Sequence, residues 1–184
     1  MRKIIVVVCV LFYSIAGYTQ YISGGVLGGV TTSQINGDGY GGFYNVGITA
    51  GGYVEFDVFQ QSRFRTELRF TQKGSGNAGG DFRIEVGYVE VPVLFSYSVN
   101  NTIALFSGLG AGFRVYEYIE EGSGFQSTTS NFGMPDVPWY VGGEYHVSDV
   151  WYFDMRSVYS VFPIDYKYHH WCLYLGIHYF LDTK

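Results

Sequence analysis

The sequence predicts an all-β protein, namely an eight-stranded antiparallel up-and-down transmembrane β-barrel. The first observation is composition: aromatic residues make up 20% of the 184 residues, glycines number 26, and only 15% of residues are charged. The second is a set of segments in which apolar and polar side chains alternate with a period of two. The third is that short and long connections alternate between these segments, as they do in membrane barrels.

The same composition excludes several classes of protein. The aromatic content is too high for a disordered chain, and glycine and tyrosine replace the alanine, glutamate and lysine of a coiled coil. The formal net charge of −5 gives no support to a nucleic-acid partner. Beyond the first twenty residues no apolar run approaches the length of a membrane-spanning helix.

The N-terminus has the pattern of a secretory signal peptide. Arg2 and Lys3 precede an apolar run from Ile4 to Ile15, and small residues follow at a plausible cleavage site. We therefore expect a signal peptide at residues 1–19 and a barrel domain at 20–184, with an uncleaved anchor as the alternative. Cleavage would remove Cys9 and leave Cys172 without an intramolecular disulfide partner.

Eight strands are expected in the mature chain, separated by Gly, Asn, Asp and Ser. Their ranges are 21–32, 43–58, 63–73, 83–99, 102–117, 137–147, 150–162 and 170–181. The connections at 60–62, 100–101 and 148–149 are tight turns, whereas 33–42, 74–82, 118–136 and 163–169 are longer loops.

Each strand has its own justification in the sequence. Apolar residues take the even positions of 43–58 and 63–73, and the odd positions of 150–162 and 170–181. The segments 21–32, 102–117 and 137–147 contain internal glycines, which permit the sharp curvature of a small barrel. In the segment 83–99, Glu90 is assigned to a polar face.

Eleven charged residues of the second to seventh expected strands are assigned to the polar face. Six of these residues are acids, Asp57 included, and five are bases, Lys73 included. We predict that this face lines the lumen and that its charges form an ion-pair network. The predicted members are Glu55, Arg65, Glu67, Arg69, Glu90, Arg114, Glu144, Asp154 and Arg156.

The alternation alone does not say which face is outside, because a soluble β-barrel or sandwich would bury its apolar face. Two features favour a membrane barrel: the balanced charges suit a narrow lumen, and no charge lies on the apolar face. A third is a set of aromatic residues at strand ends, which resemble interfacial girdles. They are Tyr44, Tyr97, Trp139, Trp151, Trp171 and Tyr179. The expected location is a Gram-negative outer membrane, with both termini in the periplasm.

Several stretches are similar to one known family. They are residues 25–56, 65–76, 86–99, 106–115, 154–164 and 174–180, and the most specific are TELRFTQKG from Thr66 and YVEVPVLF from Tyr88. The mature chain resembles the PorT-like outer-membrane β-barrels of Bacteroidota. The resemblance implies an eight-stranded outer-membrane barrel but assigns no activity. The family usually ends on an aromatic residue, whereas here Phe180 is followed by Leu-Asp-Thr-Lys.

Candidate chemistry is sparse, and no cofactor or metal is predicted. Glu144 and His146 share a face and could act as an acid/base pair, or simply as a lumen ion pair. His169 and His170, with Asp165 and Tyr168, could bind a metal, but adjacent strand residues point to opposite faces. The lumen charges could also line a gated ion path. The loop 118–136 is the candidate binding loop. Its candidate residues are Glu120, Glu121, Phe125, Phe132 and Met134.

The function predicted from these features is non-enzymatic. A small barrel with a plugged lumen offers only its loops and its lipid-facing wall, so we expect a structural or accessory subunit, or partner, of a larger secretion- or export-type outer-membrane assembly. The alternatives are a surface-loop binding or adhesion module and, less favoured, a lipid-modifying enzyme. The expected partners are outer-membrane lipids or lipopolysaccharide and other outer-membrane proteins.

Overall fold

The computed structural model describes residues 22–36, 42–76, 82–121, 124–126, 135–163 and 168–181. The signal peptide expected at 1–19 lies outside these residues. The described strands are β1 (Ile22–Asn36), β2 (Asn45–Phe59), β3 (Ser62–Gly76), β4 (Phe82–Ser98), β5 (Ile103–Glu121), β6 (Gly124–Gln126), β7 (Pro138–His146), β8 (Trp151–Ser160) and β9 (His169–Phe180). The described residues contain no helix of the length and apolar character that a membrane crossing requires.

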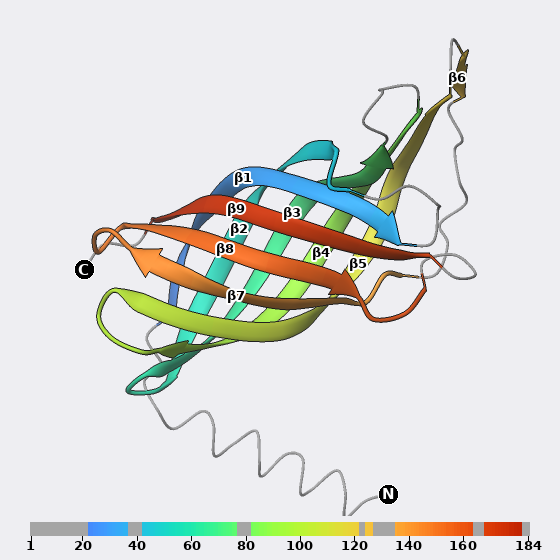
Figure 1. Ribbon diagram of the computed structural model, residues 1–184. Coiled ribbons are helices and arrows are strands. Elements are labelled where there is room, and N and C mark those ends of the chain that lie inside the picture. The colour runs from blue at the N-terminus through green and yellow to red at the C-terminus, as the bar shows by residue number, and fades with distance from the viewer. Residues whose placement is uncertain are drawn as a thin grey trace, which may run out of the picture.

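The strands close into a barrel. Each of β1 to β4 pairs antiparallel with the next strand, β5 pairs with β7, β7 with β8 and β8 with β9. The pairing of β1 with β9 completes the ring (Figure 1). Among the described strands, the short β6 lies outside the ring and pairs with the end of β5 alone. The predicted eight-stranded antiparallel barrel is therefore confirmed, with β6 as an element that the alternation did not reveal.

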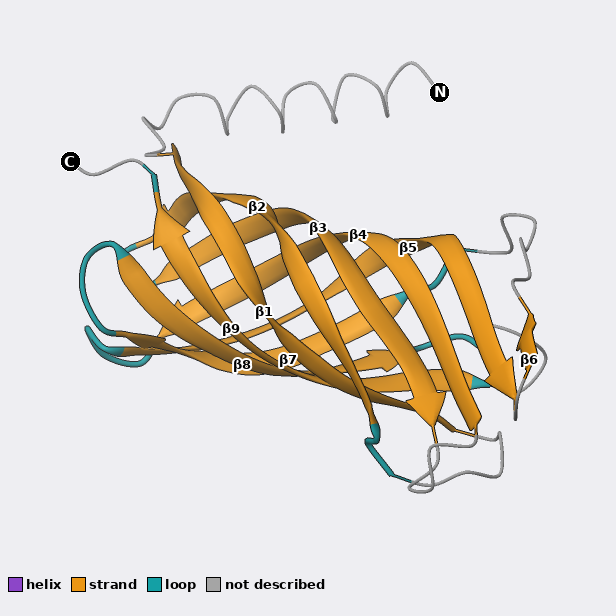
Figure 2. Cartoon of the chain, turned by 90° about the horizontal axis from the view of Figure 1, so that it is seen from above, coloured by secondary structure: helices purple, strands orange, loops and turns teal. Residues whose placement is uncertain are grey.

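The two ends of the barrel differ. The connections β2–β3, β4–β5 and β7–β8 are short, and they lie at the end where β1 begins and β9 finishes (Figure 2). We call this the turn end and the opposite one the loop end. Three strands run further toward the loop end than predicted, since β1, β3 and β5 continue to Asn36, Gly76 and Glu121. Main-chain pairing does not require an apolar face, so the polar ends of these strands stay in the sheet.

Apolar side chains point outward and charged ones inward. On the outer wall Met155 is 70% exposed and Leu68 is 61% exposed, whereas Arg65, Glu90 and Asp154 are fully buried inside. This is the reverse of a soluble barrel, and it decides between the two arrangements that the alternation left open.

The narrow lumen depends on glycine where a large side chain crosses it. Gly51 of β2 lies beside Arg69 of β3, and a Cβ atom at this position would sit 2.7 Å from the Cβ of Arg69. The missing side chain leaves the arginine room inside the barrel.

Candidate functional site

The lumen is organised around the inward face of β3. Arg63, Arg65, Arg69 and Lys73 all lie on this face, because residues of equal parity on a strand point the same way. Their carboxylate partners come from β2, β4, β7, β8 and the residues before β7. A single strand thus supplies cations for acids on both sides of the barrel.

Near the turn end, two arginines converge on one glutamate across the barrel. Arg63 Nη2 lies 2.5 Å from Glu144 Oε2, and Arg65 donates to the other oxygen of Glu144. Arg65 Nε also donates to Glu55 Oε1 at 2.5 Å. His146 completes this group, with its Nε2 3.2 Å from Glu144 Oε2. These contacts join β3 to β7 through the lumen.

The middle of the lumen is crossed by a second set of ion pairs. Arg156 of β8 donates to both oxygens of Glu67 on β3, at 3.0 and 3.1 Å. Arg156 also bonds Asp154 two residues away, with Nε at 2.9 Å from Oδ1. His178 Nε2 lies 3.4 Å from Asp154 Oδ2.

Toward the loop end, Lys73 and Arg69 share Glu90 of β4. Arg69 Nε donates to Glu90 at 2.9 Å, and Lys73 Nζ lies 2.6 Å from the other oxygen. Lys73 also reaches Asp136, which precedes β7, at 3.2 Å. Tyr88 and His170 meet across the barrel at the same end, with 3.2 Å between Oη and Nε2.

Aromatic rings surround the buried guanidinium groups. The Arg65 guanidinium lies 5.3 Å from the centre of the Tyr152 ring, and that of Arg156 lies 4.8 Å from Tyr174. Arg69 stands 4.9 Å from the Tyr140 ring. Ion pairs and cation–π contacts together compensate the cost of burying these charges. The same side chains occupy the interior of the barrel, so the lumen is filled rather than open.

The structure brings together eight of the nine residues predicted for the network, and Arg114 departs from the prediction. Arg114 pairs with Glu117 on its own strand at 3.1 Å and its side chain is 24% exposed. Alternation placed it on the correct face, but its carboxylate partner is Glu117 of its own strand and not a buried acid of another strand. Asp57 is likewise exposed.

Sequence reasoning missed members of the network. Arg63 has the parity of Arg65, which would have identified it, and Lys73 was placed on the lumen face but not in the network. His178 has the parity of the other inward residues of β9. Asp136 carried no such signal, because it lies in a segment expected to be a loop. A main-chain bridge to Gly112 holds it at the barrel wall.

The histidines of the two candidate chemical sites, His146 and the pair His169 and His170, contact other parts of the barrel. Glu144 and His146 belong to the ion-pair group at the turn end, where both oxygens of Glu144 already accept from arginine. His169 Nδ1 lies 2.8 Å from the main-chain oxygen of Ser160, whereas His170 is buried against Tyr88. Among the described residues, no group of three or more metal-ligating side chains is assembled.

The predicted girdle residues lie on the outer wall near both ends of the strands. Trp151 and Tyr179 contact each other at the turn end, with 4.5 Å between ring centres. Trp139 and Trp171 lie toward the loop end, 47% and 38% exposed. Along β9, Trp171 and Tyr179 are eight residues apart. With the rise and tilt of a barrel strand this separation is about 20 Å, close to the height of a membrane barrel's apolar band.

The candidate binding loop lies mostly outside the described part of the chain. The main chain of Glu120 and Glu121 continues β5, and Phe125 belongs to β6, which turns the segment back beside β5. Phe132 and Met134 fall outside the described residues, as do the side chains of the other three.

Comparison with known proteins identifies the fold. No family model matches the chain, and no curated protein matches it in sequence. Among solved structures, the chain is similar to Ail, the attachment invasion locus protein of Yersinia pestis, crystallised with the heparin analogue sucrose octasulfate. The TM-score is 0.60 at 16% identity, covering 87% of this chain and 99% of Ail. Neisserial surface protein A is also similar, with a TM-score of 0.56 at 10% identity over 86% of this chain and 98% of that protein.

The chain therefore has the fold of the small outer-membrane β-barrels. Together with its exposed apolar wall, this fold places it in an outer membrane.

Proposed function

We propose that this protein is a non-enzymatic accessory barrel, a subunit of or partner to a larger secretion- or export-type outer-membrane assembly. The observation that carries the proposal is the filled lumen, where ion pairs cross the barrel near both ends and at its middle. A barrel closed in this way offers other molecules its wall and its ends. Membership of the PorT-like family and a cleaved signal peptide at 1–19 belong to the same proposal, supported by the sequence stretches given above.

Extraction of the native protein in mild detergent tests this function. We expect it to migrate on a native gel as a complex well above the mass of a single chain, and crosslinking with mass spectrometry should identify the other chains. Migration as a single chain in every mild detergent, without crosslinks to other proteins, would contradict the proposal.

A second candidate is a surface-binding module, favoured by the likeness to Ail. A heparin-like ligand fits this chain poorly, because the net charge is −5 and acids such as Glu85 and Glu117 lie near the loop end. A cationic ligand fits better. Binding of purified barrel to a cationic surface in low salt, lost in the double variant Glu85→Gln with Glu117→Gln, tests this candidate.

A further inference from the structure

Strand β4 contains a proline in the middle of the barrel wall. Pairing between β3 and β4 runs from Ser62↔Tyr97 to Thr66↔Val93 and resumes at Arg69↔Glu90. In the gap, Glu67 and Leu68 lie opposite Pro92 and Val91. Proline inside a sheet is normally confined to edges and bulges, because it has no N–H to donate.

The register shows which carbonyl loses its donor. Ser98 N donates to Gln61 O at 2.8 Å, so even-numbered residues of this part of β4 direct their main-chain groups toward β3. The nitrogen of Pro92 therefore faces Glu67, and the ladder supplies no donor for the Glu67 carbonyl. The hydroxyl of Thr66 does not replace it, because it donates to Pro92 O at 3.1 Å.

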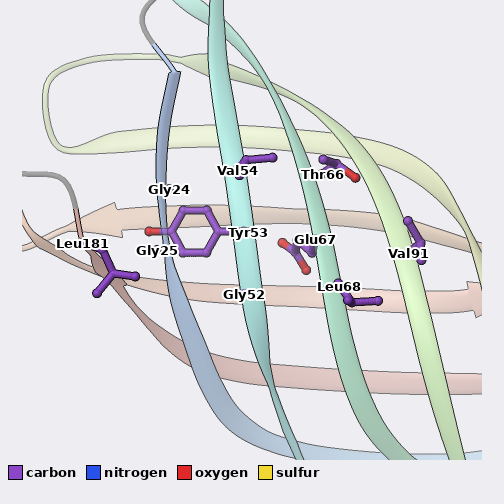
Figure 3. Close-up of a pocket in the computed structure, with 10 residues that line it drawn as sticks. All are labelled: Gly24, Gly25, Gly52, Tyr53, Val54, Thr66, Glu67, Leu68, Val91 and Leu181. Carbon is purple, nitrogen blue, oxygen red and sulfur yellow. The ribbon is translucent and has the colours of Figure 1, made fainter.

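A groove on the outer wall lies over this break. Its volume is about 820 Å³, and it extends from β1 across β2 and β3 to β4 (Figure 3). Gly24 and Gly52 have no side chains and form the floor of the groove, whereas the side chains of Leu68, Val91 and Leu181 form its sides. Glu67 lines the groove although its side chain is buried in the lumen, so its main chain is the part that borders the groove. We call this feature the β1–β4 groove.

The chemistry of the groove selects its occupant. Lipid acyl chains carry no N–H or O–H, so they leave a carbonyl at this depth without a donor. A symmetric pair of copies would place groove against groove and acceptor against acceptor, which provides neither shape nor hydrogen bond. A membrane-embedded segment of a different protein can supply both an apolar surface and a donor such as a serine, threonine or tryptophan side chain.

We propose that the β1–β4 groove is the lateral docking surface for another outer-membrane protein, whose inserted side chain donates a hydrogen bond to the Glu67 carbonyl. This inference rests on the proposed function and names the surface that the assembly uses. The ladder break at Pro92 is then part of the interface.

Photo-crosslinking in the native outer membrane tests the proposal. A benzophenone side chain is placed at Leu68 in the groove or at Leu105 of β5, which lies outside the groove and is similarly exposed, at 56% against 61%. We expect a discrete adduct with one membrane-embedded protein from Leu68 only. Pro92→Ala restores the N–H, and Gly52→Leu fills the floor. Pro92→Ala should reduce the adduct about three- to ten-fold, the ratio that one hydrogen bond supplies. Gly52→Leu should reduce it as well, because its side chain occupies the space of the inserted one.

A heat-dependent gel shift shows which variants are folded, and the two variants act through different atoms, so one serves if the other does not fold. Adducts with lipid only, or at twice the mass of the chain, would overturn the proposal. A partner found by detergent extraction but crosslinked equally from Leu105, or unaffected by both substitutions, would overturn the docking surface and leave the subunit function standing. If neither extraction nor crosslinking finds a partner protein, both the docking surface and the subunit function are wrong.

Discussion

Lys73 on β3 and Asp136 before β7 form a buried ion pair across the loop end of the lumen, with 3.2 Å between Nζ and Oδ2. Both side chains are about 1% exposed. The pair joins walls that are not adjacent in the sheet, and it ties the residue two positions before β7 to β3.

Removing one member of this pair should destabilise the barrel. Asp136→Leu leaves Lys73 with Glu90 alone, and breaking a buried pair costs about 3–5 kcal/mol. Urea unfolding in detergent, followed by tryptophan fluorescence, measures the loss. The double variant Lys73→Met with Asp136→Leu should recover part of the stability. A double variant less stable than either single one would contradict this account.

Arg65 and Arg114 should differ sharply in importance although both lie on the inward face. Arg65 is fully buried and contacts Glu55, Glu67, Glu144 and Asp154. Arg65→Met leaves these acids without their shared cation and should cost about 3–5 kcal/mol or prevent folding. Arg114→Met removes a partly exposed pair and should cost about 0–1 kcal/mol. Equal losses in unfolding experiments would show that the network is not what stabilises the lumen.

The contrast between these arginines shows what the sequence could predict. Alternation with period two gives the face of each residue, and this was sufficient for the barrel and for Arg65, Glu67 and Asp154. It does not give the partner of each residue, which depends on strand tilt and stagger, so it did not reveal that Arg114 pairs with Glu117 of its own strand. Arg156 and Glu67 are 89 positions apart in the sequence, and they become neighbours only because the sheet closes into a ring.

Two outward tryptophans donate hydrogen bonds to serines on neighbouring strands, and each bond should contribute to the free energy of unfolding. Trp171 Nε1 lies 2.9 Å from Ser157 Oγ, and Trp139 Nε1 lies 3.0 Å from Ser107 Oγ. Ser157→Ala leaves the indole N–H without its acceptor beside the bilayer and should cost about 1 kcal/mol. Tryptophan fluorescence should shift at the same time. Thr66→Ala, which removes an outer-wall hydroxyl that bonds Pro92 O and no tryptophan, is the control and should leave the emission unchanged.

A charge on the outer wall should be tolerated according to its depth. Leu175 lies midway along β9 and is 54% exposed, and Val147 lies just beyond β7 at the turn end and is 57% exposed. Leu175→Arg puts a charge among acyl chains and should cost about 2–4 kcal/mol, whereas Val147→Arg should cost about 0–1 kcal/mol. Equilibrium unfolding in short-chain phosphatidylcholine vesicles measures both. If the wall faced water, two arginines of equal exposure would be equally harmless, so equal values would refute the transmembrane arrangement.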